Sequence, residues 1–225
     1  MTTNALTPTD ADMVQRAAQP VSRRWIKRLP LVFFLAAAVL LLVSTAFPYW
    51  GMVLEAPQYP GGLQMRVFVN DMTGDGDPRL DEVREIDGLN HYIGMASLYE
   101  AAKFERSIAI PAVFLMAGLL VVAAVWRRRW TWLLAVPALV FPVVFLADLG
   151  LWMAYYGQNL DPYAPLSSAI QPFVPPVLGE GVIGQFKTAA YVDMGWYIIA
   201  AGSLLIIVAL LLRLVGWRLK AAGQP

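Results

Sequence analysis

Long apolar runs constrain this chain more than any other feature of its sequence. Each run is close to the roughly 20 apolar residues that a helix needs to cross a bilayer. The composition agrees, with 58% hydrophobic residues, 15% charged residues and a mean hydropathy of +0.56, far from the balance of an ordinary soluble domain. We therefore predict an all-α membrane protein with four transmembrane helices, at residues 29–48, 108–126, 132–155 and 194–213.

Basic residues gather at one set of ends of these runs. They are Arg23, Arg24, Lys27 and Arg28 before the first run, Arg127, Arg128 and Arg129 between the second and third, and Arg213, Arg218 and Lys220 after the fourth. Because Lys and Arg accumulate in cytoplasmic loops, we predict a multi-pass membrane protein with both termini in the cytoplasm. The cytoplasmic parts are then the tails 1–28 and 214–225 and the loop 127–131.

The first run has an alternative interpretation as a signal peptide cleaved near Ser44 to Ala46, where the residues are small. Its apolar core is longer than the roughly 7 to 15 residues of a signal sequence. We therefore favour an uncleaved membrane anchor.

The first outer segment, residues 49–107, is predicted to form a small α+β extracytoplasmic domain. A strand with one buried face is indicated by alternation with period two, in which the apolar members are Leu63, Met65, Val67 and Val69. Its partner is either Met52–Glu55 or Glu82–Ile86. From Gly88 onward the apolar spacing becomes helical, with Asp87 as the candidate N-cap.

The second outer segment, residues 156–193, is rich in proline. Its prolines are Pro162, Pro165, Pro172, Pro175 and Pro176. Proline lacks a backbone donor and fixes φ, so we predict no long regular element here. The apolar residues of the segment indicate a lid that packs over the helices.

The chain contains one histidine and no cysteine, which excludes disulfides and thiolate metal sites. His91 and Met95 are four residues apart on the predicted helix and would point the same way. Imidazole with thioether suits copper, above all Cu(I), and Met65 and Met72 are candidates to complete the site. The alternative is an ordinary hydrogen-bonded histidine and methionines that fill the core.

An acidic stretch after the predicted strand matches part of a calcium-binding loop. Asp71, Asp75, Asp77 and Glu82 stand at the first, fifth, seventh and twelfth places of the EF-hand template. Thr73 stands at the third place, where Asp or Asn is expected. The alternative is an acidic hairpin turn, since Asp and Gly are ordinary turn residues.

Asp148 lies inside the third apolar run. A carboxylate at that depth is unfavourable unless it is paired or protonated, so we expect it to face the bundle interior or the lid. Lys187 and Arg106 are the predicted partners. The side chain either serves a proton or cation step or makes a structural hydrogen bond to the lid.

Motifs of the common enzyme classes are missing from the sequence. It has no nucleophile elbow, phosphate loop or HExxH pair, and its apolar runs contain no histidine that could bind haem. We therefore predict that the protein is not an enzyme. Nucleic acid is excluded as a partner, because no basic stripe lies outside the membrane flanks.

Short motifs spread from about Pro48 to Asp193 carry a resemblance to a known group of proteins. They are EIDGLNHYIGM at 85–95, AAKFER at 101–106, ADL at 147–149, DPYAPL at 161–166 and IGQF at 183–186. In these motifs the chain resembles small bacterial four-span membrane proteins encoded beside copper-handling and nitrous oxide reductase accessory genes. The resemblance implies copper delivery or cuproenzyme assembly, with His91 and Met95 as the matching residues.

We therefore expect an accessory protein of the bacterial inner membrane, surrounded by the lipid bilayer, that handles copper or assembles a cuproenzyme at the periplasmic face. Its expected cofactor is copper, and its expected partner is a periplasmic copper protein or an ABC-type accessory complex. A structural scaffold subunit of a membrane complex is the alternative. A sensor or transporter that works through Asp148 is a third interpretation.

Overall fold

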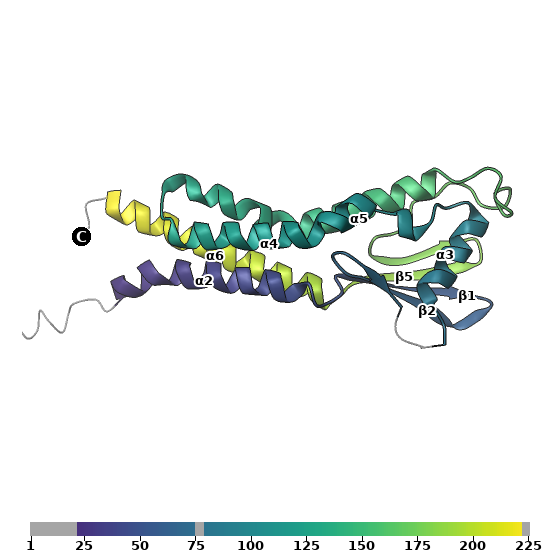
Figure 1. Cartoon of the computed structure of the whole chain (residues 1–225), viewed down its shortest axis with the longest axis horizontal. Helices are drawn as coiled ribbons and strands as arrows, with labels where there is room; N and C mark the ends of the chain where they lie inside the picture. Colours follow the sequence, from purple (N-terminus) through teal and green to yellow (C-terminus); the bar gives the residue numbers. More distant parts are fainter. Residues whose placement is uncertain (1–21, 75–78, 222–225) are drawn as a thin grey trace, which may run out of the picture.

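The protein is elongated, with helices bundled at one end and a β-sheet at the other (Figure 1). The computed structural model describes residues 22–74 and 79–221. The helices are α2 (Ser22–Ser44), α3 (Glu82–Ile93), α4 (Lys103–Val125), α5 (Val136–Gln158) and α6 (Met194–Ala221), with short 3-10 helices η1 (Leu98–Glu100) and η2 (Arg129–Ala135). The strands are β1 (Trp50–Ala56), β2 (Tyr59–Val67), β3 (Met72–Thr73), β4 (Gly179–Ile183) and β5 (Phe186–Val192).

The protein is a membrane protein, as predicted. Among the described residues, three helical segments are long and apolar enough to cross a bilayer, and these are Lys103–Val125, Arg129–Gln158 and Met194–Arg218. The prediction of four such helices is wrong. The apolar part of α2 that the structure describes runs from Arg28 to Ser44, which falls short of about 20 residues. α2 ends at Ser44, whose hydroxyl donates back to the Leu41 carbonyl.

Helices α2, α4 and α6 form the packed core of the bundle. Phe34 of α2, Leu120 of α4 and Ile206 of α6 are buried in one apolar cluster. Arg213 of α6 is buried beside them and donates through Nη2 to the Ala124 carbonyl at 2.9 Å. Its guanidinium carbon lies 4.5 Å from the centre of the Phe34 ring. Arg213 thereby pairs one of the carbonyls that the end of α4 leaves without a helical partner.

The sheet overturns the all-α prediction. It has five antiparallel strands in the order β3-β2-β1-β5-β4. β1 is central, because Met52 pairs with Met65 of β2 on one side and with Ala190 of β5 on the other. β4 and β5 come from the segment predicted to be an irregular lid. Its prolines all precede Gly179, and burial alternates along residues 186–192 as in a strand with one buried face.

The sheet joins the bundle where two distant parts of the chain cross side by side. The Asp193 N–H donates to the Tyr49 carbonyl, and the Gly195 N–H donates to the Pro48 carbonyl at 2.7 Å. A Cβ on Gly195 would lie 2.7 Å from the Phe47 carbonyl oxygen, so only glycine allows this approach. Tyr49 is buried at the crossing, and burial raises the pKa of its hydroxyl to about 12.

Helix α3 begins earlier than its sequence pattern suggested. Asp81 is the N-cap, and its carboxylate accepts a hydrogen bond from the Arg84 N–H. The predicted start at Gly88 is therefore wrong, and Asp87 lies inside the helix. The alternative strand at Glu82–Ile86 is likewise wrong, because these residues form the first turns of α3.

Two carboxylates of α3 attach it to the sheet. Glu82 is buried and accepts from the backbone N–H of Gln64 at 3.1 Å. The Tyr59 hydroxyl donates to Glu85 at 2.5 Å, and this hydrogen bond raises the pKa of the Tyr59 phenol. Ile86 of α3 is buried in one apolar cluster with Leu63 and Met65 of β2. α3 therefore covers one face of β2.

The proline-rich segment between α5 and β4 packs against both α3 and the sheet. The Asp161 N–H donates to the carbonyl of Gly94, the residue that ends α3 with a φ of +87°. Farther along, the Val177 carbonyl accepts from the indole N–H of Trp50 at 2.6 Å. These contacts hold the segment across the outer end of the molecule.

Two glycines near α3 provide a matched test of this packing. A Cβ on Gly94 would lie 2.8 Å from the Asp161 carbonyl oxygen in a left-handed conformation, whereas Gly88 has open space around it. We expect Gly94→Ala to lower stability by more than about 1 kcal/mol and Gly88→Ala to raise it by about 0.5–1 kcal/mol. Thermal unfolding followed by circular dichroism measures both, and a Gly94→Ala variant as stable as the wild type would contradict the description.

Candidate functional site

A cavity of about 400 Å³ lies between the sheet and the helices. The inner face of the sheet forms one wall, α3 forms a second, and α4 and α5 form a third. Most of the lining is apolar, and the sheet contributes Trp50, Met52, Leu54, Met65, Phe186 and Thr188 among others. Alternate residues of a strand share one face, so the register of β1, β2 and β5 brings these side chains together.

Six of the nine methionines of the chain line this cavity. They are Met52, Met65, Met72, Met95, Met116 and Met153. Met52 and Met65 are direct partners across β1 and β2, while Met72 of β3 pairs with Val67, two residues farther along β2. Three residues of the predicted metal site, Met65, Met72 and Met95, therefore line the same cavity.

The fourth predicted ligand, His91, is not part of the lining. Its side chain is exposed and its ring lies beside that of Tyr92, with centroids 6.3 Å apart. Gly94 ends α3 before Met95, so His91 and Met95 do not share a helix and the assumed four-residue spacing does not align them. An isolated glycine near the end of a helical pattern is the sequence signal for such a stop.

Carboxylates and imidazole do not form a metal centre in the part of the chain that the structure describes. Residues 22–74 and 79–221 contain no group of three or more His, Asp or Glu side chains placed to hold an ion. Soft donors are a different case, because the described methionines of the cavity carry thioethers, a donor type selective for Cu(I).

The charged residues of the lining are Asp71, Glu105, Arg106 and Asp148. Arg106 forms an ion pair with Asp71, with 3.6 Å between Nη2 and Oδ1. Glu105 of α4 and Asp148 of α5 contribute two further carboxylates to the same lining. A carboxylate in apolar surroundings is stabilised by a proton, a cation or a hydrogen-bond donor that reaches it.

Asp148 lies on α5 and lines the cavity, half-buried. Neither predicted partner reaches it, because Lys187 pairs with Glu180 at 3.8 Å and Arg106 pairs with Asp71. No hydrogen bond or ion pair connects Asp148 with another of the described residues. Its carboxylate is therefore a polar group that the cavity offers to a ligand.

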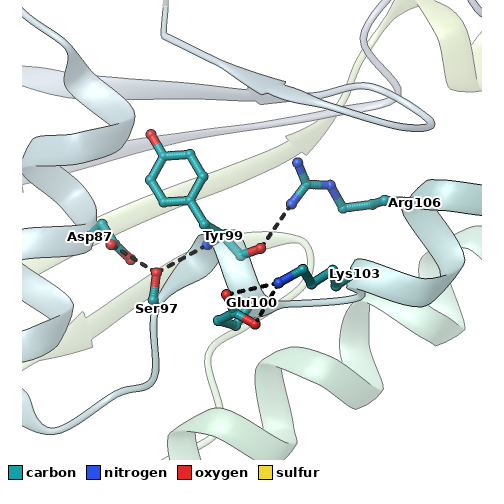
Figure 2. Close-up of polar contacts among 6 residues, drawn as sticks. All are labelled: Asp87, Ser97, Tyr99, Glu100, Lys103 and Arg106. Carbon is teal, nitrogen blue, oxygen red and sulfur yellow. Dashed lines mark hydrogen bonds and ion pairs between the residues drawn. The ribbon is translucent and has the colours of Figure 1, made fainter.

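Arg106 fastens the edge of the cavity through three contacts. Besides Asp71, it donates to the Asn70 carbonyl through Nε at 3.4 Å and to the Tyr99 carbonyl through Nη1 at 3.5 Å. Figure 2 shows Arg106 directed at Tyr99 and, nearby, Asp87 bonded to Ser97. Arg106 thus ties the turn between β2 and β3 to the connection between α3 and α4.

The predicted calcium turn is only partly covered by the described residues. Asp75 and Asp77 lie outside them. Asp71 forms an ion pair with Arg106. Glu82, at the start of α3, accepts a hydrogen bond through its carboxylate from the backbone N–H of Gln64 in β2. Two of the four proposed ligands are therefore engaged with protein groups.

Sequence reasoning missed the walls contributed by β5 and α5. The signal for β5 was present, because Phe186, Thr188 and Ala190 alternate with Lys187 and other residues that are more exposed. The signal for α5 was hidden, since an apolar helix shows no difference between the face that meets lipid and the face that meets a cavity.

A scan against protein-family models finds no match, and neither does a comparison with curated proteins.

The Arg106 contacts predict a local effect of its replacement. We expect Arg106→Gln to speed amide hydrogen exchange several-fold in residues 70–73 and 98–101, with a change in global stability below about 1 kcal/mol, because the contacts are long and partly exposed. The control is Lys103→Gln, which removes only an exposed pair with Glu100. Unchanged exchange at residues 70–73 in Arg106→Gln would show that Arg106 does not hold the turn between β2 and β3 in place.

Proposed function

We propose that this protein is a non-enzymatic accessory protein that holds an apolar molecule at the outer face of the bacterial inner membrane. The observation that carries the proposal is the cavity of about 400 Å³ with its mostly apolar lining. Small-molecule sites typically have this size and character, with a few polar groups that orient the ligand.

Water is a poor occupant of this space. A volume of 400 Å³ would hold roughly a dozen waters at liquid density. Buried waters need several polar partners each, and side chains such as Leu54, Met65 and Ile86 offer none. An apolar ligand would pack against the apolar walls. The carboxylates of Asp148 and Glu105 could then bind a polar group on that ligand.

The orientation of the chain is part of the proposal. The arginine-rich connection at Arg127–Arg129, the start of α2 and the end of α6 lie at the end of the bundle opposite the sheet (Figure 1). The preference of basic residues for the cytoplasmic side supports a sheet and cavity that face the periplasm.

Filling the cavity tests the proposal. We expect delipidated protein in amphipol to bind 1-aminoanthracene saturably, and Ala112→Phe, which projects a ring from α4 into the lining, to weaken binding by about tenfold or more, or about 1.4 kcal/mol. The matched control is Ala201→Phe on the exposed face of α6. Equal affinity in the two variants would count against the cavity as the site.

Copper is a second candidate ligand, supported by the six methionines of the lining. Thioether sulfur is a soft donor that selects Cu(I), and Met52 and Met65 are adjacent across the strands. A protein with this site would hand copper to a partner at the periplasmic face. His91 is not needed as a ligand in this arrangement.

Replacing adjacent thioethers tests the copper proposal. We expect Met52→Leu with Met65→Leu, a change that nearly conserves side-chain volume, to lower Cu(I) affinity about tenfold or more in competition with a chelator. Met194→Leu, at an exposed position, and His91→Ala serve as controls that retain affinity. If the wild type does not bind Cu(I), the copper proposal is wrong and the apolar ligand is the remaining candidate. If it binds neither Cu(I) nor 1-aminoanthracene, a scaffold function is the remaining candidate.

A further inference from the structure

We infer that the apolar molecule is the acyl chain of a membrane phospholipid, which enters the cavity sideways between α4 and α5. Its head group would stay beside Glu105, Arg106 and Asp148. The inference rests on the proposed function and specifies the class of ligand and its route. Neither follows from the existence of the cavity alone.

The lining of the cavity continues along the membrane-spanning part of α4. Ile108, Ala112 and Met116 line it, and residues four apart share one face of a helix. Eight residues of α-helix measure about 12 Å. The cavity therefore follows α4 into its membrane-spanning part and is not confined to the sheet.

Two lining residues on α4 and α5 keep large accessible surfaces. Ile108 of α4 is 44% exposed and Val144 of α5 is 52% exposed, although both line the cavity. Both belong to segments that are long and apolar enough to cross the membrane, so we place the mouth of the cavity between them, where it would face acyl chains. A chain in the bilayer can therefore reach the interior without passing through water.

The charged groups lie one helical turn from this opening. Glu105 precedes Ile108 by three residues, and Asp148 follows Val144 by four, so both carboxylates lie on the sheet side of the gap. Arg106 is beside them. This is the level expected for a head group whose chain enters below it. A zwitterionic head group, with an ammonium for the carboxylates and a phosphate for Arg106, matches both signs of charge.

Photo-crosslinking in a bilayer tests the inference. The protein is placed in nanodiscs of phosphatidylethanolamine that carries a diazirine near the end of one acyl chain, and labelled peptides are mapped by mass spectrometry. We expect labels on Met65 and Leu89, which line the cavity from β2 and α3, as well as on the lipid-facing helices. Labels confined to the exposed faces of the helices would overturn lateral access.

Narrowing the opening provides the matched variants. We expect Ile108→Trp and Val144→Trp each to reduce labelling of Met65 and Leu89 several-fold. Phe114→Trp, which is 63% exposed on the same helix and outside the lining, should leave it unchanged. Equal labelling in all three variants would overturn the proposed route.

The head group is tested by changing the lipid. Nanodiscs of phosphatidylglycerol should give several-fold weaker labelling of Met65 than nanodiscs of phosphatidylethanolamine. Equal labelling from the two lipids would overturn the match to a zwitterionic head group.

The dye experiment separates this inference from the proposed function. If 1-aminoanthracene binding is sensitive to Ala112→Phe while no lipid label reaches Met65, the cavity takes an apolar molecule from water and only the lipid route is wrong. If neither dye nor lipid reaches the cavity, both proposals are wrong.

Discussion

The structure depends on the crossing at which β1 leaves α2 and β5 enters α6. Backbone hydrogen bonds from Asp193 to Tyr49 and from Gly195 to Pro48 hold the two segments together, although more than 140 residues separate them in the sequence. Because β1 and β5 are adjacent in the sheet, this pairing fixes the sheet on the end of the bundle. A buried backbone group without a partner is costly, so the crossing cannot shift without disturbing both layers.

The position of the sheet creates the space beneath it. β1 pairs with β2 and β5, so alternate side chains of all three strands face α4 and α5, and α3 closes a further side. Methionine is suited to such a wall, because its flexible and polarizable side chain adapts to different occupants. Four charged residues, Asp71, Glu105, Arg106 and Asp148, also line the cavity, and Arg106 joins the turn after β2 to the connection before α4. The lining is thus mostly apolar, with a few charged side chains.

The sequence predicted the local features better than their assembly. Alternation at Leu63, Met65 and Val67 correctly indicated β2, and apolar runs correctly indicated a membrane protein. The sheet itself was beyond reach, because its central pairing joins residues 50–55 to 187–192 and no local pattern specifies a partner at that separation. The expected alignment of His91 with Met95 was wrong, because Gly94 adopts a left-handed conformation that ends α3 before Met95. Three of the four predicted metal ligands nevertheless line one cavity, since apolar strand residues and methionines are buried for the same reason.

The central claim is that the space between sheet and bundle is built to be occupied. The most direct measurement is an experimental density map of the protein in nanodiscs of native membrane lipid. We expect continuous elongated density from the level of Asp148, past Val144 and into the space under Met52 and Met65. A map in which the walls meet and these side chains fill the space themselves would contradict the account.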